Sequence, residues 1–228
     1  MSTYIKKLIA GGENQYLDFK FEVNDSRKIA RSLVAFANTD GGTLLIGVKD
    51  NGVIAGVRSE EEYYMVQAAA TMYCQPEIHF STHEWNIDKK KVLEVTVQHH
   101  PDILYYAQDK DGKWLVYIRV DDHNLLANRV YLQARKKRKR EQGVFLAYTE
   151  KEKLLLEYLD RNSNITLSKF LRLAGIKKNQ AERILANFVA LDIINQVMSE
   201  SGCYYTLEEG FTESLTPKTN LPEEFLKW

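Results

Sequence analysis

The residues with the clearest chemical potential are six consecutive cations in the middle of the chain, which read RKKRKR. Lysine and arginine side chains neutralise the phosphates of a nucleic-acid backbone and release its counterions. Without these six, the 31 basic residues fall to 25 against 31 acidic ones, so the positive charge is local. On a helix the six span only about 8 Å, so three or four can face one phosphate backbone. We expect nucleic-acid contact, rather than a merely solvated linker helix, from Arg135, Lys136, Lys137, Arg138, Lys139 and Arg140.

A second set of polar side chains lies at the start of a predicted helix that reads KKNQAERILANFVALDII. Its apolar residues recur at helical spacing and predict one buried side. If this is the third helix of a winged helix-turn-helix, its N-terminal residues enter the major groove and contact the bases. Nucleic-acid binding is therefore also predicted for Lys177, Lys178, Gln180 and Arg183. The alternative is a winged helix that makes only protein contacts.

The glycine-rich stretch FANTDGGTLLIGVKDNG, residues 36–52, is a third candidate for chemistry. A phosphate-binding Walker loop has the pattern G-x-x-x-x-G-K-[ST] and lies between a strand and a helix. Here the Gly41-Gly42 pair follows a predicted helix, and no lysine followed by serine or threonine comes after it. The spacing G-x-G-x-x-G is absent as well. ATP hydrolysis is therefore not expected, and the glycines are explained by turns that need positive φ.

The elements that must position these residues fall into two groups. In the first, YLDFKFEV alternates and predicts a half-buried strand with Asp18 and Lys20 on its solvated face. A helix capped by Asp25 or Ser26 follows and ends near Asn38. Residues 43–48 predict a strand covered on both faces, joined by DNG to a hairpin partner, VIAGV. A helix is expected to run from Asn124 into the basic cluster.

The second group predicts three helices and a terminal hairpin. Thr149 and Glu152 form a capping box before a leucine-rich helix at 150–161. A short helix closed by Gly175, the helix described above and a hairpin through SESG complete the pattern. The expected class is α+β, with a mixed α and β domain at 1–130, a basic helical linker at 131–148, a winged helix-turn-helix at 149–210 and a tail at 211–228.

Composition limits the remaining possibilities. The N-terminus has no apolar core long enough for a signal peptide, and no window approaches the ~18–20 apolar residues of a membrane span. The two cysteines, Cys74 and Cys203, lie far apart without metal-ligand spacing, which suits a reducing cytosol. A cytoplasmic protein with no membrane partner is expected.

Several segments, taken in order and spacing, resemble the Schlafen/AlbA-like DNA-binding domain family. They are residues 13–20 (ENQYLDFK), 35–42 (AFANTDGG), 45–48 (LIGV), Asp50, Gly52, Gly56, 117–119 (YIR) and 124–128 (NLLAN). The resemblance covers about residues 1–130. It implies a mixed-sheet domain and a bacterial transcriptional regulator of the kind that carries a C-terminal winged helix.

The Schlafen branch of the family implies a second function. Some members are similar to metal-dependent ribonucleases with three acids as the site, and the matching positions here are Glu13, Asp18 and Asp50. Clustered carboxylates can hold Mg²⁺ or Mn²⁺, which then activates water against a phosphodiester. Asp18 departs from the family's usual glutamate, and Lys49 stands where many relatives have an acid. The structural alternatives are a solvated strand face for Asp18 and a turn for Asp50.

The sequence thus favours a DNA-binding transcriptional regulator that needs no cofactor and acts as a homodimer, since winged helices commonly bind paired half-sites. A Mg²⁺- or Mn²⁺-dependent RNA endonuclease is the alternative from a different class. A protein-interaction adaptor that binds no nucleic acid is the third.

Overall fold

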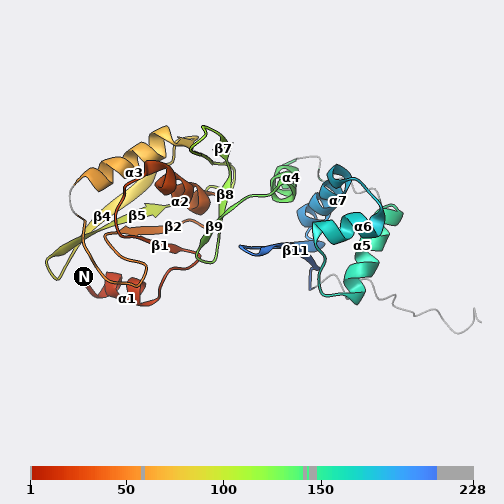
Figure 1. The fold of residues 1–228 in the computed structure, drawn as a ribbon, viewed down its shortest axis with the longest axis horizontal. Coiled ribbons are helices and arrows are strands. Elements are labelled where there is room, and N and C mark those ends of the chain that lie inside the picture. Colours follow the sequence, from red (N-terminus) through yellow and green to blue (C-terminus); the bar gives the residue numbers. More distant parts are fainter. Residues whose placement is uncertain (1, 58–59, 141–142, 144–147, 210–228) are drawn as a thin grey trace, which may run out of the picture. The chain divides into compact units, whose positions relative to one another are not determined.

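A computed structural model describes residues 2–57, 60–140, 143 and 148–209 of the chain. The chain forms two compact units, Met1–Ala127 and Asn128–Trp228, and each is treated by itself below. Both contain helices and strands, which confirms the α+β class (Figure 1). Among the described residues, no helix has the length and apolarity that a bilayer span requires.

The N-terminal unit is built around a four-stranded sheet in the order β1-β2-β5-β4. β1 and β2 are parallel, with Asp18 opposite Leu44, and the other two pairings are antiparallel. The strands are β1 (Leu17–Lys20), β2 (Gly42–Ile46), β4 (Phe80–Ile87) and β5 (Lys90–Val97). The helices are α1 (Ser2–Ala10), α2 (Ser26–Asn38) and α3 (Glu61–Met72).

Two smaller sheets complete this unit. One has the order β3-β6-β7, and the other is the antiparallel pair of β8 and β9. Their bounds are β3 (Cys74–Gln75), β6 (Tyr106–Gln108), β7 (Trp114–Leu115), β8 (Tyr117–Val120) and β9 (His123–Leu126). The expected helix from Asn124 is wrong at its start, because residues 123–126 pair with β8 and the helix begins only after Asn128.

Strand β2 is covered on both faces, as its continuous apolar run predicts. Leu44 and Ile46 pack in one core with α2 and α3, whereas Leu45 packs on the other face with Ile5 of α1. Figure 1 shows α2 and α3 on one side of the sheet and α1 on the other. The expected N-cap is confirmed, because Asp25 accepts a hydrogen bond from the backbone N–H of Arg27.

The glycines of residues 36–52 have two different physical roles. Gly41 has φ +75 in the turn before β2, as the turn explanation predicts. Gly42 is required by packing, since a Cβ there would lie 2.3 Å from a ring carbon of Phe36. The expected hairpin partner VIAGV forms no strand, and only Ile54 makes a bridge, to Val48, because β5 occupies that side of β2.

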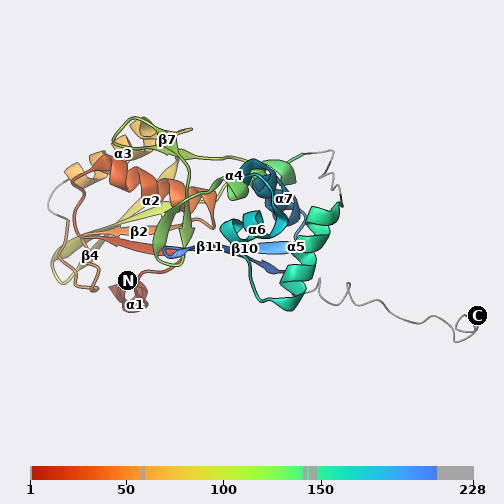
Figure 2. The ribbon, with the colours of Figure 1, turned by 45° about the vertical axis from the view of Figure 1, so that its right-hand side comes forward.

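The C-terminal unit contains four helices and a hairpin (Figure 2). The helices are α4 (Arg129–Arg138), α5 (Glu150–Arg161), α6 (Leu167–Ala174) and α7 (Lys178–Ala190), and the strands are β10 (Ile194–Ser199) and β11 (Gly202–Leu207). The capping box of Thr149 and Glu152 is confirmed, as is the left-handed Gly175 that ends α6. A single bridge joins Ile165 to Tyr205 of the hairpin.

The basic segment expected as a linker begins as an integral helix of this unit. Val130 and Ala134 of α4 are buried in the same apolar core as α5, α6 and α7. The apolar side predicted for α7 is confirmed, since apolar residues at helical spacing along it are buried: Ala181, Ile184, Leu185, Phe188 and Val189. The packing of α4 fixes the direction in which its cations project. Residues 141–142, 144–147 and 210–228 of the predicted linker, winged helix and tail lie outside the described residues.

Candidate nucleic-acid interface

The cations of α4 lie in its last turn and just beyond it. Lys136, Lys139 and Arg140 are exposed, and Arg135 and Lys137 are half-buried. Arg138 differs, because its Nη2 donates to the backbone oxygen of Val189 at 2.6 Å and to Oδ1 of Asp192 at 2.5 Å. Arg138 therefore ties the end of α4 to the end of α7, and the other cations of the run face solvent in whole or in part.

The two predicted sets of cations lie on two helices that pack together, α4 and α7. Partial burial and the positive charges of Arg140 and Arg183 together hold the pKa of Lys137 below its usual range. Arg183 acts on Lys137 from α7, so the two side chains are electrostatic neighbours. The sequence places these residues more than forty positions apart, and the packing of α4 on α7 makes them one positive surface.

Helix α7 presents polar side chains on the face that the core leaves open. The predicted residues Lys177, Lys178, Gln180 and Arg183 are all exposed. The sequence analysis did not identify Asn187, which follows Arg183 by one helical turn and is half-buried, with an Oδ1 that has no hydrogen-bond partner in the described part of the chain. Its spacing of four residues from Arg183 is the signal that marks it.

An ion-pair group sits where α4 and α7 begin. Nη1 of Arg129 contacts Asn179 Oδ1 at 3.0 Å and Glu182 Oε2 at 3.4 Å. Lys178 Nζ lies 3.9 Å from the other oxygen of the same buried carboxylate. Arg129 was not predicted, because the sequence analysis placed the helix start too early. With Arg138 at the other end, these contacts show that α4 runs alongside α7 in the same direction.

The hairpin β10–β11 contributes no positive charge. Residues 194–207 contain no lysine or arginine, and their turn carries Glu200. The described cations of this unit therefore lie on its helices or next to them.

In the N-terminal unit, Glu13 and Asp18 form a close carboxyl pair. Burial, followed by a hydrogen bond with Asp18, raises the pKa of Glu13 from 4.5 to about 7. Burial alone would raise the pKa of Asp18, but the hydrogen bond from Glu13 and the charges of Lys20 and Arg119 lower it on balance. The pair thus shares a proton in mildly acidic solution, with the proton held mainly by Glu13.

Asp18 is held from several sides, which explains why it is buried on a strand predicted to be half exposed. Its oxygens contact Lys20 Nζ at 3.0 Å, Ser32 Oγ at 3.0 Å and Arg119 Nη2 at 3.6 Å. The solvated strand face expected for Asp18 is therefore wrong, since α2 and β8 cover it.

Arg119 is the centre of this buried network. Its guanidinium donates to the backbone oxygens of Asn14 and Leu17 and to Oδ1 of Asn124. Nδ2 of Asn124 in turn donates to Oγ of Ser32. The network joins the segment before β1 to α2, β8 and β9. Three segments that are distant in sequence are thus locked together by one arginine.

The residues of this network lie within the region that matches a known family. The family model described as "Schlafen, AlbA_2" matches residues 13–128, more than half of the chain. The chain belongs to this family. Nucleic-acid binding is the general function attached to this family. No curated protein matches the chain.

Solved structures give weaker likenesses. The DIP2311 protein from Corynebacterium diphtheriae is 17% identical with a TM-score of 0.44, and the match covers 70% of this chain and 38% of that one. The N-terminal domain of a RecG-related protein from Nitrosomonas europaea is 18% identical with a TM-score of 0.35, and the match covers 56% of this chain and 94% of that one.

The Schlafen, AlbA_2 membership makes the three-acid hypothesis worth testing against the geometry. No group of three histidine, cysteine or acidic side chains that could hold a metal occurs among the described residues. Asp50 is exposed in the turn after β2 and does not join Glu13 and Asp18 in such a group. Both carboxyl groups accept hydrogen bonds from the protein. Glu13 accepts from the backbone N–H of Phe19 at 2.7 Å, and Asp18 accepts from the hydroxyl of Ser32. The described residues thus bring Glu13 and Asp18 together without Asp50, and the metal-dependent nuclease stays a prediction.

Proposed function

We propose that the C-terminal unit is a winged helix that binds duplex DNA and that the chain is a transcriptional regulator. The layout supports this proposal: α5, α6 and α7 precede a two-stranded hairpin, and α6 and α7 are joined by a short turn at Gly175. In such a layout α7 is the recognition helix, and α6 lies across the backbone.

The observation that carries the proposal is the packing of α4 alongside α7, shown by their shared core and by the contacts of Arg129 and Arg138. This packing supports the proposal, because the cations at the end of α4 then neighbour the exposed polar residues of α7, and the charge of Arg183 acts on Lys137. On the exposed face of α7, Gln180 and Arg183 carry the side-chain types that hydrogen-bond adenine and guanine edges in the major groove. We infer that α7 contacts bases and that Lys136, Lys139 and Arg140 contact phosphates.

The role of α4 follows from the charge of the hairpin. A wing commonly adds backbone contacts, but here its strands and turn have no cation. The end of α4 supplies the positive charge in its place. Arg138 is the exception within the run, because its contacts with Val189 and Asp192 make it a structural residue.

The test measures the salt dependence of binding to duplex DNA. Each neutralised phosphate contributes about −0.9 to the slope of log K against log salt concentration. The double variant Lys136→Gln/Lys139→Gln should therefore flatten the slope by about 2. The matched control Lys110→Gln/Lys113→Gln removes two exposed cations from the N-terminal unit and should leave the slope unchanged. Equal slopes for both double variants would exclude this role for α4.

A second measurement addresses the bases. A pool of random duplexes, enriched by several rounds of binding, yields a preferred sequence for the wild-type chain. Arg183→Ala should then lose preference for that sequence by about tenfold or more while retaining binding to unselected DNA. If no sequence were enriched, the protein would bind DNA without sequence preference, and this result would contradict the proposed role as a transcriptional regulator. The homodimer stays a prediction, and sedimentation of the free protein and of its DNA complex tests it.

A further inference from the structure

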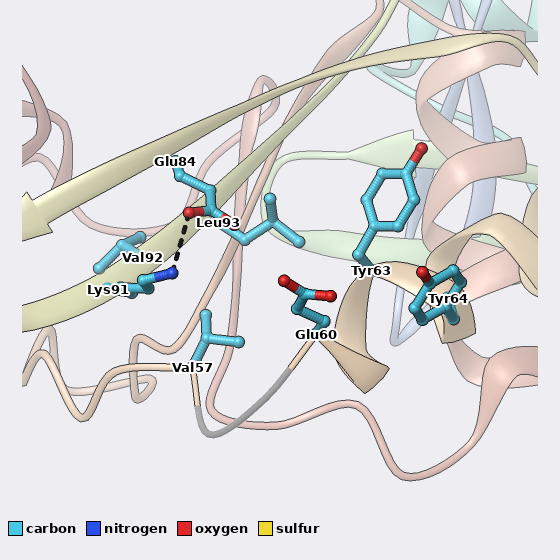
Figure 3. Close-up of a pocket in the computed structure, with 8 residues that line it drawn as sticks. All are labelled: Val57, Glu60, Tyr63, Tyr64, Glu84, Lys91, Val92 and Leu93. Carbon is cyan, nitrogen blue, oxygen red and sulfur yellow. Dashed lines mark hydrogen bonds and ion pairs between the residues drawn. The ribbon is translucent and has the colours of Figure 1, made fainter.

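A cavity in the N-terminal unit lies far along the chain from the cations of α4 and is not explained by the proposed function. It has a volume of about 340 Å³ and opens between the start of α3 and the strands β4 and β5 (Figure 3). Its walls are Val57, Glu60, Tyr63, Tyr64, Glu84, Lys91, Val92 and Leu93. The volume lies in the range of small-molecule sites, which combine apolar walls with a few polar groups.

Two tyrosines of α3 are exposed at this cavity. The side chains of Tyr63 and Tyr64 are 38% and 63% exposed, and their rings meet edge to face with centroids 5.7 Å apart. Tyr63 also contacts the ring of Phe80 edge to face, so its orientation is fixed by β4. An exposed and oriented aromatic surface beside a cavity favours a flat, aromatic ligand.

Glu60 supplies the polar group of the cavity. It immediately precedes α3, and its backbone oxygen accepts a hydrogen bond from the Tyr64 N–H. Glu60 is exposed, and its side chain neither caps the helix nor makes a hydrogen bond or ion pair within the described residues. In Figure 3 its carboxylate extends toward Leu93, into the space between Val57 and Tyr63. The two acceptor oxygens therefore face the cavity without a donor, and a ligand with two adjacent donors would satisfy both.

The other charged groups of the cavity neutralise each other. Lys91 Nζ lies 3.2 Å from Glu84 Oε2, and both side chains are more than half exposed at the mouth. Leu93 is 5% exposed and Val92 is fully buried, so the floor is apolar. A ligand would thus meet an apolar floor, an aromatic wall, one unpaired carboxylate and a lysine at the entrance.

We propose that this cavity binds a guanine base, stacked on Tyr64 and hydrogen-bonded through N1–H and N2–H to the carboxylate of Glu60. Among the four bases only guanine presents two adjacent donors on its Watson–Crick edge. Adenine and cytosine pair a donor with an acceptor there, and uracil flanks its donor with two carbonyl oxygens, which a carboxylate repels. Unstacked bases are bound by proteins in this manner, by stacking on aromatic rings and by contacts to that edge.

The base has two possible sources with the same chemistry, a free nucleotide or an unpaired guanine in a nucleic-acid strand. Lys91, at the mouth, is placed to contact a phosphate in either case. The full-length protein is therefore titrated with the four nucleoside monophosphates and with oligothymidine that carries one or no guanine, by saturation-transfer NMR and calorimetry. Preference for GMP identifies a free nucleotide, and a guanine preference confined to the oligonucleotide identifies a strand.

Variants test the named contacts. Glu60→Gln turns one acceptor into a donor, so guanine binding should weaken by about tenfold or more, and the preference should move toward adenine. Glu61→Gln removes the adjacent carboxylate, which does not line the cavity, and should change nothing. Tyr64→Ala should weaken all bases by about tenfold.

Equal binding of all bases, or guanine binding that survives Glu60→Gln, would overturn the proposal. Binding of duplex DNA through α4 and α7 should be unaffected by all three variants, so failure here and failure of the proposed function can be distinguished.

Discussion

The carboxyl pair of Glu13 and Asp18 makes the stability of the N-terminal unit depend on pH in an unusual direction. Most acids have a lower pKa in the folded chain and stabilise it as the pH rises. Burial and Asp18 instead raise the pKa of Glu13 from 4.5 to about 7, so the folded chain binds more protons than the unfolded chain between these values. Linkage then requires that the free energy of unfolding falls as the pH rises through this window.

The size of the effect follows from the same shift. A shift of one pKa unit corresponds to about 1.4 kcal/mol, but solvent screening reduces the effect because Glu13 is partly exposed. We expect a loss of about 1–2 kcal/mol between pH 4.5 and 7. Asp18 acts in the opposite sense only at lower pH, because its own pKa is lowered from 3.8. Glu13→Gln keeps a hydrogen-bonding amide next to Asp18 without a titrating group, and should remove the loss.

The assay is urea unfolding followed by tryptophan fluorescence, in full-length protein that carries Trp228→Phe. Trp85 and Trp114 then report on the N-terminal unit alone. The quantity of interest is the difference in unfolding free energy between Glu13→Gln and the parent, which should rise by about 1–2 kcal/mol from pH 4.5 to 7. The exposed Glu77→Gln serves as the charge-matched control with no such rise. If the free energies of unfolding of the parent and Glu13→Gln changed equally with pH, the shared proton would be refuted.

Three further outcomes test the packing. Arg119→Met should lower the stability of the N-terminal unit by about 3–5 kcal/mol in the same fluorescence assay, since it leaves buried acceptors and a carboxylate without their partner; a loss below about 1 kcal/mol would contradict a central role. Gly42→Ala should cost about 1–3 kcal/mol because its Cβ meets the ring of Phe36, and an unchanged urea midpoint would contradict this contact. Arg138→Gln should destabilise the C-terminal unit by about 1 kcal/mol in circular-dichroism melts, whereas Lys139→Gln should not; equal effects would show that the tie to α7 contributes nothing.

Local patterns in the sequence predicted the elements that short-range physics controls. The caps at Asp25 and Thr149 and the end of α6 at Gly175 depend on side chains within a few residues, and all three are present in the structure. The apolar side of α7 was also predicted correctly, because helical spacing alone selects it. The family was recognisable for a related reason, since its motifs are contiguous.

Pairing between strands accounts for the errors. The segment HNLL contains nothing that forbids a helix, and it is a strand because β8 offers it hydrogen bonds. VIAGV lost its expected place beside β2 to β5, which lies forty residues further along. Which of two candidate strands pairs with a given strand depends on the whole fold. Local patterns in a single sequence do not show the outcome.

The candidate sites divide in the same way. The sequence by itself determined that the chain carries a run of six cations, a polar start of α7 and an acidic pair near its N-terminus. Only the tertiary structure decided that the charge of Arg183 acts on Lys137 and that Arg138 is a structural residue. It also decided that Asp18 is buried against Arg119, while Asp50 joins no metal-binding group among the described residues. The physical reason is that charge and hydrogen-bonding capacity belong to each residue, whereas burial and proximity, which set pKa values and binding surfaces, belong to the packed fold.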